Sequence, residues 1–178
     1  MDTKTLKRIV GIASIVLGVL VLVMAFFAAV TSGGDDPVTF TGFNLIFGKQ
    51  TTELSGSIGS VASSDAKIVF CFGLLLAYFL PVVAAVLLLL VVFGKSKGLS
   101  FVFGCVAFGC FVASIILLAC TKNMATYSWT VTLLGKSSTS TSHFDSYDLG
   151  IGSILAIVCA GLGACTSGTF TVLQFLKK

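Results

Sequence analysis

The sequence predicts an integral membrane protein: an all-α four-helix bundle with a small extracellular antiparallel β-sheet formed by two outer loops. Composition and the length of the apolar segments predict the bundle. Hydrophobic residues make up 56% of the 178-residue chain and charged residues only 10%, against roughly 25% charged in an ordinary soluble domain. The sheet is predicted because both loops are rich in Thr and aromatic residues, which favour strands.

Four segments have the length and composition of transmembrane helices. A hydrocarbon core of about 30 Å requires about 20 apolar residues at 1.5 Å rise each. The predicted spans are residues 9–30, 68–93, 99–120 and 149–176, and none contains Asp, Glu, Lys, Arg or His. For the first segment the alternative is a cleaved secretory signal peptide, since basic residues precede it. Its apolar run is longer than the roughly 7–15 residues of a signal core, so we interpret it as a span.

The distribution of basic residues predicts the orientation. Lysine and arginine near the spans are retained in the cytoplasm. On one side of the four-span chain lie seven basic residues, namely Lys4, Lys7, Arg8, Lys95, Lys97, Lys177 and Lys178. We therefore expect both termini and the turn at 94–98 to be cytoplasmic, and the loops 31–67 and 121–148 to lie outside the plasma membrane. The net charge of +4 then reflects topology and anionic lipid, not binding of nucleic acid.

The two outer loops contain similar segments. Residues 39–52 and 126–139 align without gaps and are identical at four positions, including the Gly-Lys steps 48–49 and 135–136. This similarity predicts either an internal duplication or a chance match. We expect both segments to form strands, with residues 51–53 and 137–142 as their return strands. All of them would join in one sheet that caps the helix ends, because a lone hairpin is marginal in water. Residues 55–64 have the composition of a linker, and Asp65 is a candidate cap for the second span.

Small residues recur along the spans at helical spacing. The most regular series lies in the fourth span, at Gly152, Ala156, Ala160, Ala164 and Gly168. Such a stripe permits close helix contact, which drives helix association in lipid. It indicates packing inside the bundle or, alternatively, a face for a partner helix or a second copy. The third span has a comparable series at Cys105, Gly109 and Ala113. In the second span, Pro81 predicts a kink.

No motif indicates catalysis, a cofactor, a metal or a nucleotide. The spans lack the ionisable groups that pumps and proton relays use. The three Gly-Lys steps lack the earlier glycine of a phosphate-binding loop. His143 is the only histidine, and the six cysteines all lie in or beside the spans, where they resemble small apolar residues. We therefore expect a protein that is not an enzyme.

The predicted layout resembles the claudin-like tetraspan family, with four spans, cytoplasmic ends and strands from both outer loops. The nearest feature to the family's Trp-x-x-Gly-Leu-Trp-x-x-Cys pattern is Phe40-Thr41-Gly42-Phe43-Asn44-Leu45, and the first loop has neither Trp nor Cys. No functional residue is carried over from the family. The resemblance implies an outer sheet above the bundle.

We expect the protein to act through contacts with a membrane-protein partner or with itself, surrounded by membrane lipids. The alternative is lipid binding in a cleft beside Tyr78 and Pro81. Aromatic residues dominate the energies of interfaces, so the candidate contacts are Phe40, Phe43, Phe47, Tyr127 and Trp129. The same rings would equally suit packing between the sheet and the helix ends at the membrane interface.

Overall fold

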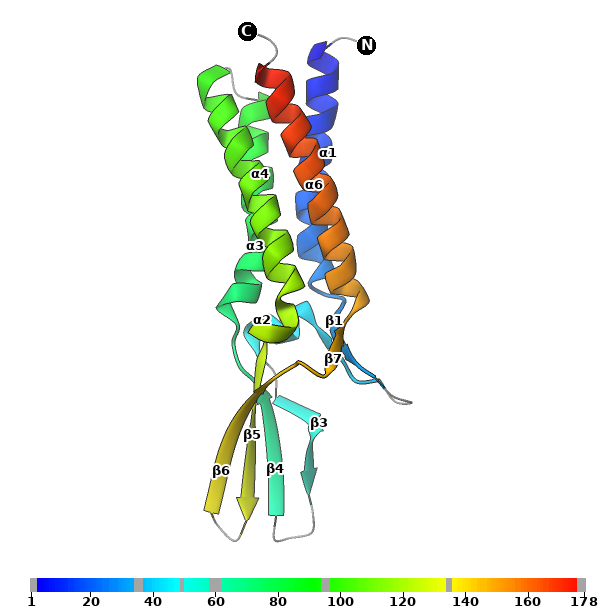
Figure 1. Ribbon diagram of the computed structural model, residues 1–178, viewed down its shortest axis with the longest axis vertical. Coiled ribbons are helices and arrows are strands. Elements are labelled where there is room, and N and C mark those ends of the chain that lie inside the picture. Colours follow the sequence, from blue (N-terminus) through cyan, green and yellow to red (C-terminus); the bar gives the residue numbers. More distant parts are fainter. Residues whose placement is uncertain are drawn as a thin grey trace.

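The computed structural model describes residues 3–33, 37–48, 50–57, 62–93, 97–133 and 136–175. Its helices are α1 (Thr3–Met24), α2 (Gly42–Phe47), α3 (Phe72–Phe93), α4 (Lys97–Ala119), α5 (Thr121–Met124) and α6 (Ile151–Phe175). Its strands are β1 (Ala28–Ser32), β2 (Thr39–Thr41), β3 (Gln50–Ser57), β4 (Ala62–Ile68), β5 (Thr126–Leu133), β6 (Lys136–His143) and β7 (Tyr147–Leu149). The molecule is a long rod, with the helix bundle at one end and the strands at the other (Figure 1).

The four long helices form a ring. Helix α1 packs against α3 and α6, and α4 packs against the same two helices. Each of the four is long and apolar enough to cross a membrane, which indicates a multi-pass membrane protein and confirms the predicted four-helix layout. Large apolar side chains also cover the outside of the ring, among them Ile9, Val16, Val86, Ile116 and Val158. Lipid solvates such a surface, whereas water would not.

Three of the predicted helix ends lie elsewhere in the structure. Helix α1 runs from Thr3 to Met24 and not over residues 9–30, and α3, the second long helix of the bundle, begins at Phe72 and not at 68. After Met24 the chain turns and continues as β1, which pairs with a strand on each side and buries Ala29 and Val30. An apolar run long enough for a helix therefore ends as a buried strand. Helices α4 and α6 agree with their predicted bounds to within two residues.

A three-stranded antiparallel sheet, here called the basal sheet, lies at the strand end of the bundle. Its order is β2-β1-β7, and Val30 in the central strand pairs with Phe40 on one side and Leu149 on the other. The amide of Gly150 donates to the carbonyl of Ala29 at 2.8 Å, which ties the start of α6 to β1. The basal sheet thus joins both outer loops directly to the helices.

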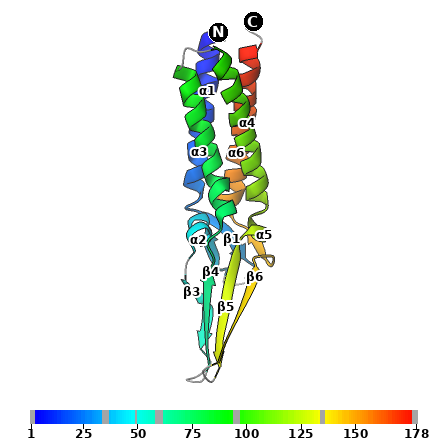
Figure 2. The ribbon, with the colours of Figure 1, turned by 90° about the vertical axis from the view of Figure 1, so that its left-hand side faces the viewer.

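A second antiparallel sheet, here called the projecting sheet, extends away from the bundle as the long blade seen in Figures 1 and 2. Its order is β3-β4-β5-β6, so a hairpin from each loop contributes two strands. The single predicted sheet is therefore wrong in number, although the prediction that both loops share antiparallel strands is correct. The predicted linker at 55–64 includes the end of β3 and the start of β4, and Asp65 lies in β4 opposite Thr130 instead of capping a helix.

Helix α2 separates the two sheets, and it replaces a predicted strand. The hydroxyl of Thr41 caps the helix by accepting a hydrogen bond from the amide of Asn44 at 3.2 Å. Gly48 ends it with a φ of 78°, a backbone conformation that favours glycine. The segment 39–52 is thus strand, helix and strand, whereas 126–139 contains two long strands. The two aligned segments do not share a fold, which argues against a duplication in that alignment.

Pro81 leaves a carbonyl without its helical partner, and a neighbouring helix supplies a replacement. Proline has no N–H to donate to the carbonyl of Ala77, four residues earlier. The hydroxyl of Ser114 on α4 donates to that oxygen at 2.6 Å, and both Ala77 and Ser114 are fully buried. On the other side of α3, an added Cβ at Gly18 would lie 2.5 Å from the Pro81 carbonyl oxygen. The proline region is therefore held by α1 and α4 together.

Candidate interaction surface

An aromatic cluster fills the space behind the basal sheet. Phe144 is fully buried, and its ring lies 5.7 Å from Phe40, 5.1 Å from Tyr127 and 5.0 Å from Tyr147. The three pairs are edge-to-face, a geometry that aromatic quadrupoles favour. Phe40 is only 2% exposed, so this predicted contact residue lies in the core and does not line a surface. Tyr127, another predicted contact, is half-buried against the same cluster.

The cluster also changes the acidity of Tyr147. Partial burial, followed by the influence of Tyr127, raises the pKa of the Tyr147 phenol above its ordinary value of 10.0. The neutral phenol is the form that a desolvated aromatic site favours. Tyr147 is half-buried with its ring 5.0 Å from Phe144, so it belongs to the aromatic cluster itself.

A second group of phenylalanines lies on the outside of the molecule at the same level. Phe43 and Phe47 on α2 are 45% and 50% exposed. Their ring centroids are 4.6 Å apart, Phe43 stacks on Phe26 at 5.6 Å, and Phe47 lies 6.4 Å from Phe70. A belt of exposed aromatic rings at the helix ends is typical of the boundary between lipid and water. These two predicted contact residues are thus exposed beside the helix ends, a position that would suit the boundary between lipid and water.

The two faces of the projecting sheet differ in chemistry. Residues directly opposite each other in an antiparallel pair point to the same face, and successive residues alternate. One face carries hydroxyl pairs such as Thr130 with Thr139, whose Oγ1 atoms are 3.0 Å apart. The other face carries the apolar residues of the two central strands. Ile68 is opposite Tyr127, Ala66 is opposite Trp129, and Val131 follows on β5. Trp129 is 47% exposed, and no described element covers it.

Strand β6 forms one edge of this sheet. It pairs with β5 in a continuous register over all eight residues, from Leu133 with Lys136 to Thr126 with His143. All eight of its residues are exposed, and in the described chain it has no second strand neighbour. The opposite edge, β3, is different, because its pairing with β4 has a register shift between Thr51 and Gly56. The sheet thus has one regular edge and one irregular edge.

The small-residue stripe of α6 faces the inside of the bundle. Ala156 and Ala160 are fully buried, Gly152 and Ala164 are buried, and Gly168 is half-buried. An added Cβ at Gly152 would lie 2.8 Å from the carbonyl oxygen of Ala28, so the helix start packs directly on the basal sheet. A hydrogen bond of 2.7 Å between the hydroxyls of Ser14 and Thr166 joins α1 to α6. This arrangement is packing within one chain.

The comparable series on α4 faces outward instead. Cys105 and Gly109 are exposed, and nothing lies within 4 Å of a Cβ added at Gly109. Helix α4 packs through a different series, Gly104, Ala107, Phe111, Ser114 and Leu118, all of them buried. This inner series combines two large side chains with small ones, so a search for small residues alone misses it.

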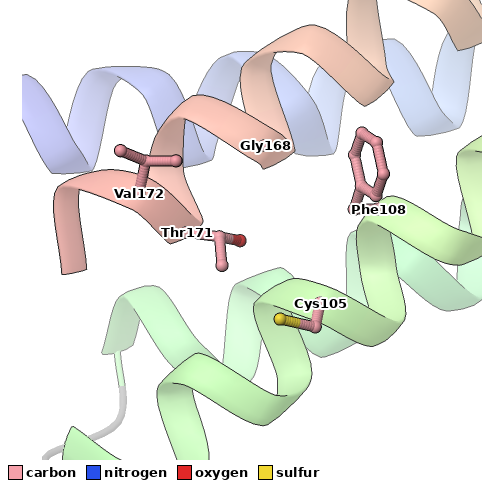
Figure 3. Close-up of a pocket in the computed structure, with 5 residues that line it drawn as sticks. All are labelled: Cys105, Phe108, Gly168, Thr171 and Val172. Carbon is pink, nitrogen blue, oxygen red and sulfur yellow. The ribbon is translucent and has the colours of Figure 1, made fainter. Parts of the chain in front are cut away.

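The outward series borders a shallow hollow between α4 and α6. It has a volume of about 240 Å³ and is lined by Cys105, Phe108, Gly168, Thr171 and Val172 (Figure 3). Tyr78, beside which a lipid cleft was predicted, is fully buried. The Tyr78 and Ser153 hydroxyls also have no hydrogen-bond partner in the described chain.

The reactive side chains are dispersed. All six cysteines are free thiols, and His143 is exposed at the end of β6 beside the bundle. In the residues that the structure describes, no three His, Cys, Asp or Glu side chains gather where a metal ion would bind. Comparison with known proteins adds no assignment: no protein-family model, no curated protein and no solved structure matches the chain.

Proposed function

We propose that the chain is a non-enzymatic, claudin-like tetraspan protein of the plasma membrane that acts through protein–protein contacts. Its termini lie in the cytoplasm and its two sheets lie outside the cell in this proposal. The charge distribution supports the orientation, because the seven basic residues near the terminal end of the bundle outnumber those near the sheets.

The observation that carries the proposal is the projecting sheet. The sheet extends well beyond the helices (Figure 2). Trp129 in its central strand β5 and the whole edge strand β6 are exposed there. A thin sheet without a covering layer gains little stability from burial. Such an element is better suited to meeting another protein than to stabilising the bundle.

Photo-crosslinking in the native membrane tests this function. A photoreactive amino acid placed at Trp129 should capture a defined protein, which mass spectrometry then identifies. The same amino acid at Ile154, which faces outward on α6, is the control and should capture lipid. Capture of lipid alone from both positions would contradict the proposal.

Lipid binding is a second candidate, favoured by the hollow between α4 and α6. Its apolar lining of Cys105, Phe108 and Val172 would suit an acyl chain. If a lipid binds there at fixed stoichiometry, Gly168→Leu should remove it by filling the hollow. Gly161→Leu is the matched control, because a Cβ at Gly161 meets nothing within 4 Å and the residue does not line the hollow. Equal lipid content in both variants would exclude this candidate.

A further inference from the structure

We propose that β6 is a self-association edge, which pairs with β6 of a second copy of this chain in a facing membrane and joins two projecting sheets into one. This inference rests on the proposed function and names the partner. It follows from three properties of the sheet, namely an open regular edge, the directions of its strands and its distance from the bundle.

The first property is that β6 lacks the features that normally protect an edge strand. Proteins block exposed edges with proline, bulges or charged residues, because unpaired N–H and C=O groups otherwise recruit another strand. β6 has no proline, its pairing with β5 has no irregularity, and its only lysine is at its first residue. Residues 137–142 are all Ser or Thr, so no like charges oppose self-pairing there. β3, with its register shift, has one of the protective features.

The second property is strand direction, which decides where the partner lies. β6 runs from the distal tip of the sheet towards the bundle in every copy (Figure 1). Two copies side by side in one membrane would therefore pair β6 with β6 in parallel. Two copies in facing membranes are related by a two-fold axis in the plane between them, and their β6 strands pair antiparallel. The antiparallel ladder is the more stable one, and it continues the pattern of the existing sheet.

A neighbour in the same membrane offers one further choice, which the structure disfavours. Its β3 would run antiparallel to β6 and lie at the same height, because Thr51, Ala66, Trp129 and Ser140 form one row across the sheet. The shift between Thr51 and Gly56, however, places four residues of β3 opposite Asp65 alone, which interrupts the ladder that β6 would need. Of the two described edges of the projecting sheet, β6 of a second copy is therefore the one that supplies a regular antiparallel partner.

The third property is reach. Eight residues of strand extend about 27 Å at roughly 3.4 Å each, and the sheet lies beyond the basal layer (Figure 2). The membrane-proximal end of β6 is beside α5, where the amide of Phe144 donates to the Lys122 carbonyl. The distal part of the edge is thus the accessible part. A single strand pair is a weak contact, but many pairs between two membranes act together through multivalency.

A cysteine matrix in reconstituted vesicles tests the pairing. Single variants S138C, T139C, S140C and T141C in β6 and T51C in β3 are placed in separate vesicle populations, which are then mixed and oxidised. The unmodified chain, whose own thiols lie in or beside the helices, gives the background. In an antiparallel pair, each step forward along one strand is a step backward along the other, so the residue numbers of opposed positions always have the same sum. Antiparallel self-pairing therefore predicts disulfides between vesicle populations only for variant pairs that share one such sum.

Each competing arrangement gives a different pattern. Parallel pairing within one membrane would crosslink every β6 variant with itself inside a single population. Pairing with β3 would crosslink T51C with S140C in co-reconstituted vesicles. Either pattern, or no disulfide above background, would overturn the inference. The proposed function would survive those results if Trp129 still captured another protein in the native membrane.

Vesicle clustering provides an independent measurement. Vesicles that carry the unmodified chain should cluster. Vesicles that carry a variant whose β6 edge is blocked by proline should not cluster. Alternate N–H groups of β6 point to β5 and to the open edge, so S138P and T139P should differ. The variant that loses only the outward N–H should abolish clustering and leave the emission of Trp129, the sole tryptophan, unchanged. Full clustering with both proline variants would overturn the inference.

Discussion

The two sheets show how the same two loops can build regions of opposite character. The basal sheet has short strands of three to five residues, yet it buries Ala29 and Val30 completely and rests on an aromatic cluster. The projecting sheet has long strands of seven and eight residues, yet β6 is exposed throughout. Strand length therefore does not indicate which sheet stabilises the fold. Burial against the bundle indicates it, because the removal of apolar area from water lowers the free energy of the folded state.

Substitution of one aromatic residue in each region should give the largest contrast. Phe144→Ala removes a fully buried ring with three aromatic neighbours, and it should reduce the free energy of unfolding by about 3–5 kcal/mol. Trp129→Ala removes a half-exposed ring and should cost about 0.2–1 kcal/mol. Denaturant unfolding in mild detergent, followed by circular dichroism, measures both. Equal losses would mean that the projecting sheet contributes to the core.

A smaller effect is expected within the bundle at Ser114. Ser114→Ala leaves the buried Ala77 carbonyl without a partner and should cost about 1–3 kcal/mol. The matched control is Ser14→Ala, which loses a contact with Thr166 and should cost about 0.6 kcal/mol. In a Pro81→Ala background, residue 81 regains an N–H for the Ala77 carbonyl, so the cost of Ser114→Ala should shrink. An unchanged cost in that background would contradict the replacement of the lost bond.

Hydrogen exchange should separate the two sheets without a substitution. The amides of β1 are in a central strand that is buried between β2 and β7. They should exchange more slowly than those of β6, which is exposed on one edge. Exchange measured by mass spectrometry on the protein in detergent or nanodiscs resolves the two segments. Strong protection of β6 in dispersed monomers would show that something covers its edge.

The smallest expected effect is a pH dependence at Tyr147. Because burial raises its pKa in the fold above 10.0, the unfolded state loses this proton first as the pH rises. The contribution of the protonated Tyr147 to the free energy of unfolding is fully present below pH 10, and it is lost as the pH increases from 10 through the raised pKa of the folded state. In Tyr147→Phe the free energy of unfolding should therefore decrease less steeply with pH in that range. Denaturant unfolding of the variant and of the unmodified chain at several pH values in that range provides the test, and equal slopes for both would contradict the prediction.

Sequence composition predicts the four long helices well because length and the lack of charge are local properties. Small-residue spacing identifies the inner side of α6, but on α4 the series with Cys105 and Gly109 faces outward. The break at Met24 was not predictable in this way, since the apolar run continues without interruption from Met24 through Val30. Only pairing with β2 and β7 turns that segment into a strand. Tertiary contacts override local preference there.

The interaction candidates show the same division. Both Phe40 and Trp129 were predicted as contact residues because they are aromatic. Phe40 is buried in the basal sheet, however, and Trp129 is exposed on the projecting sheet. The serine-rich part of the second loop carried no aromatic signal, although it forms the whole of the exposed edge β6. Its threonines favour a strand, and pairing with β5 confirms the predicted return strand at residues 137–142.

The neighbouring positions of β4 and β5 in the projecting sheet have a consequence for biosynthesis. β4 ends at Ile68 and β5 begins at Thr126, so two complete membrane spans must be made between two strands that lie side by side. At about 5–20 residues per second, the β3–β4 hairpin waits roughly 3–12 seconds for its partner. During that time it has two open edges and no covering layer. A translation pause between α3 and α4 would lengthen this interval, and with it the time during which the open edges of the first hairpin can pair with another chain.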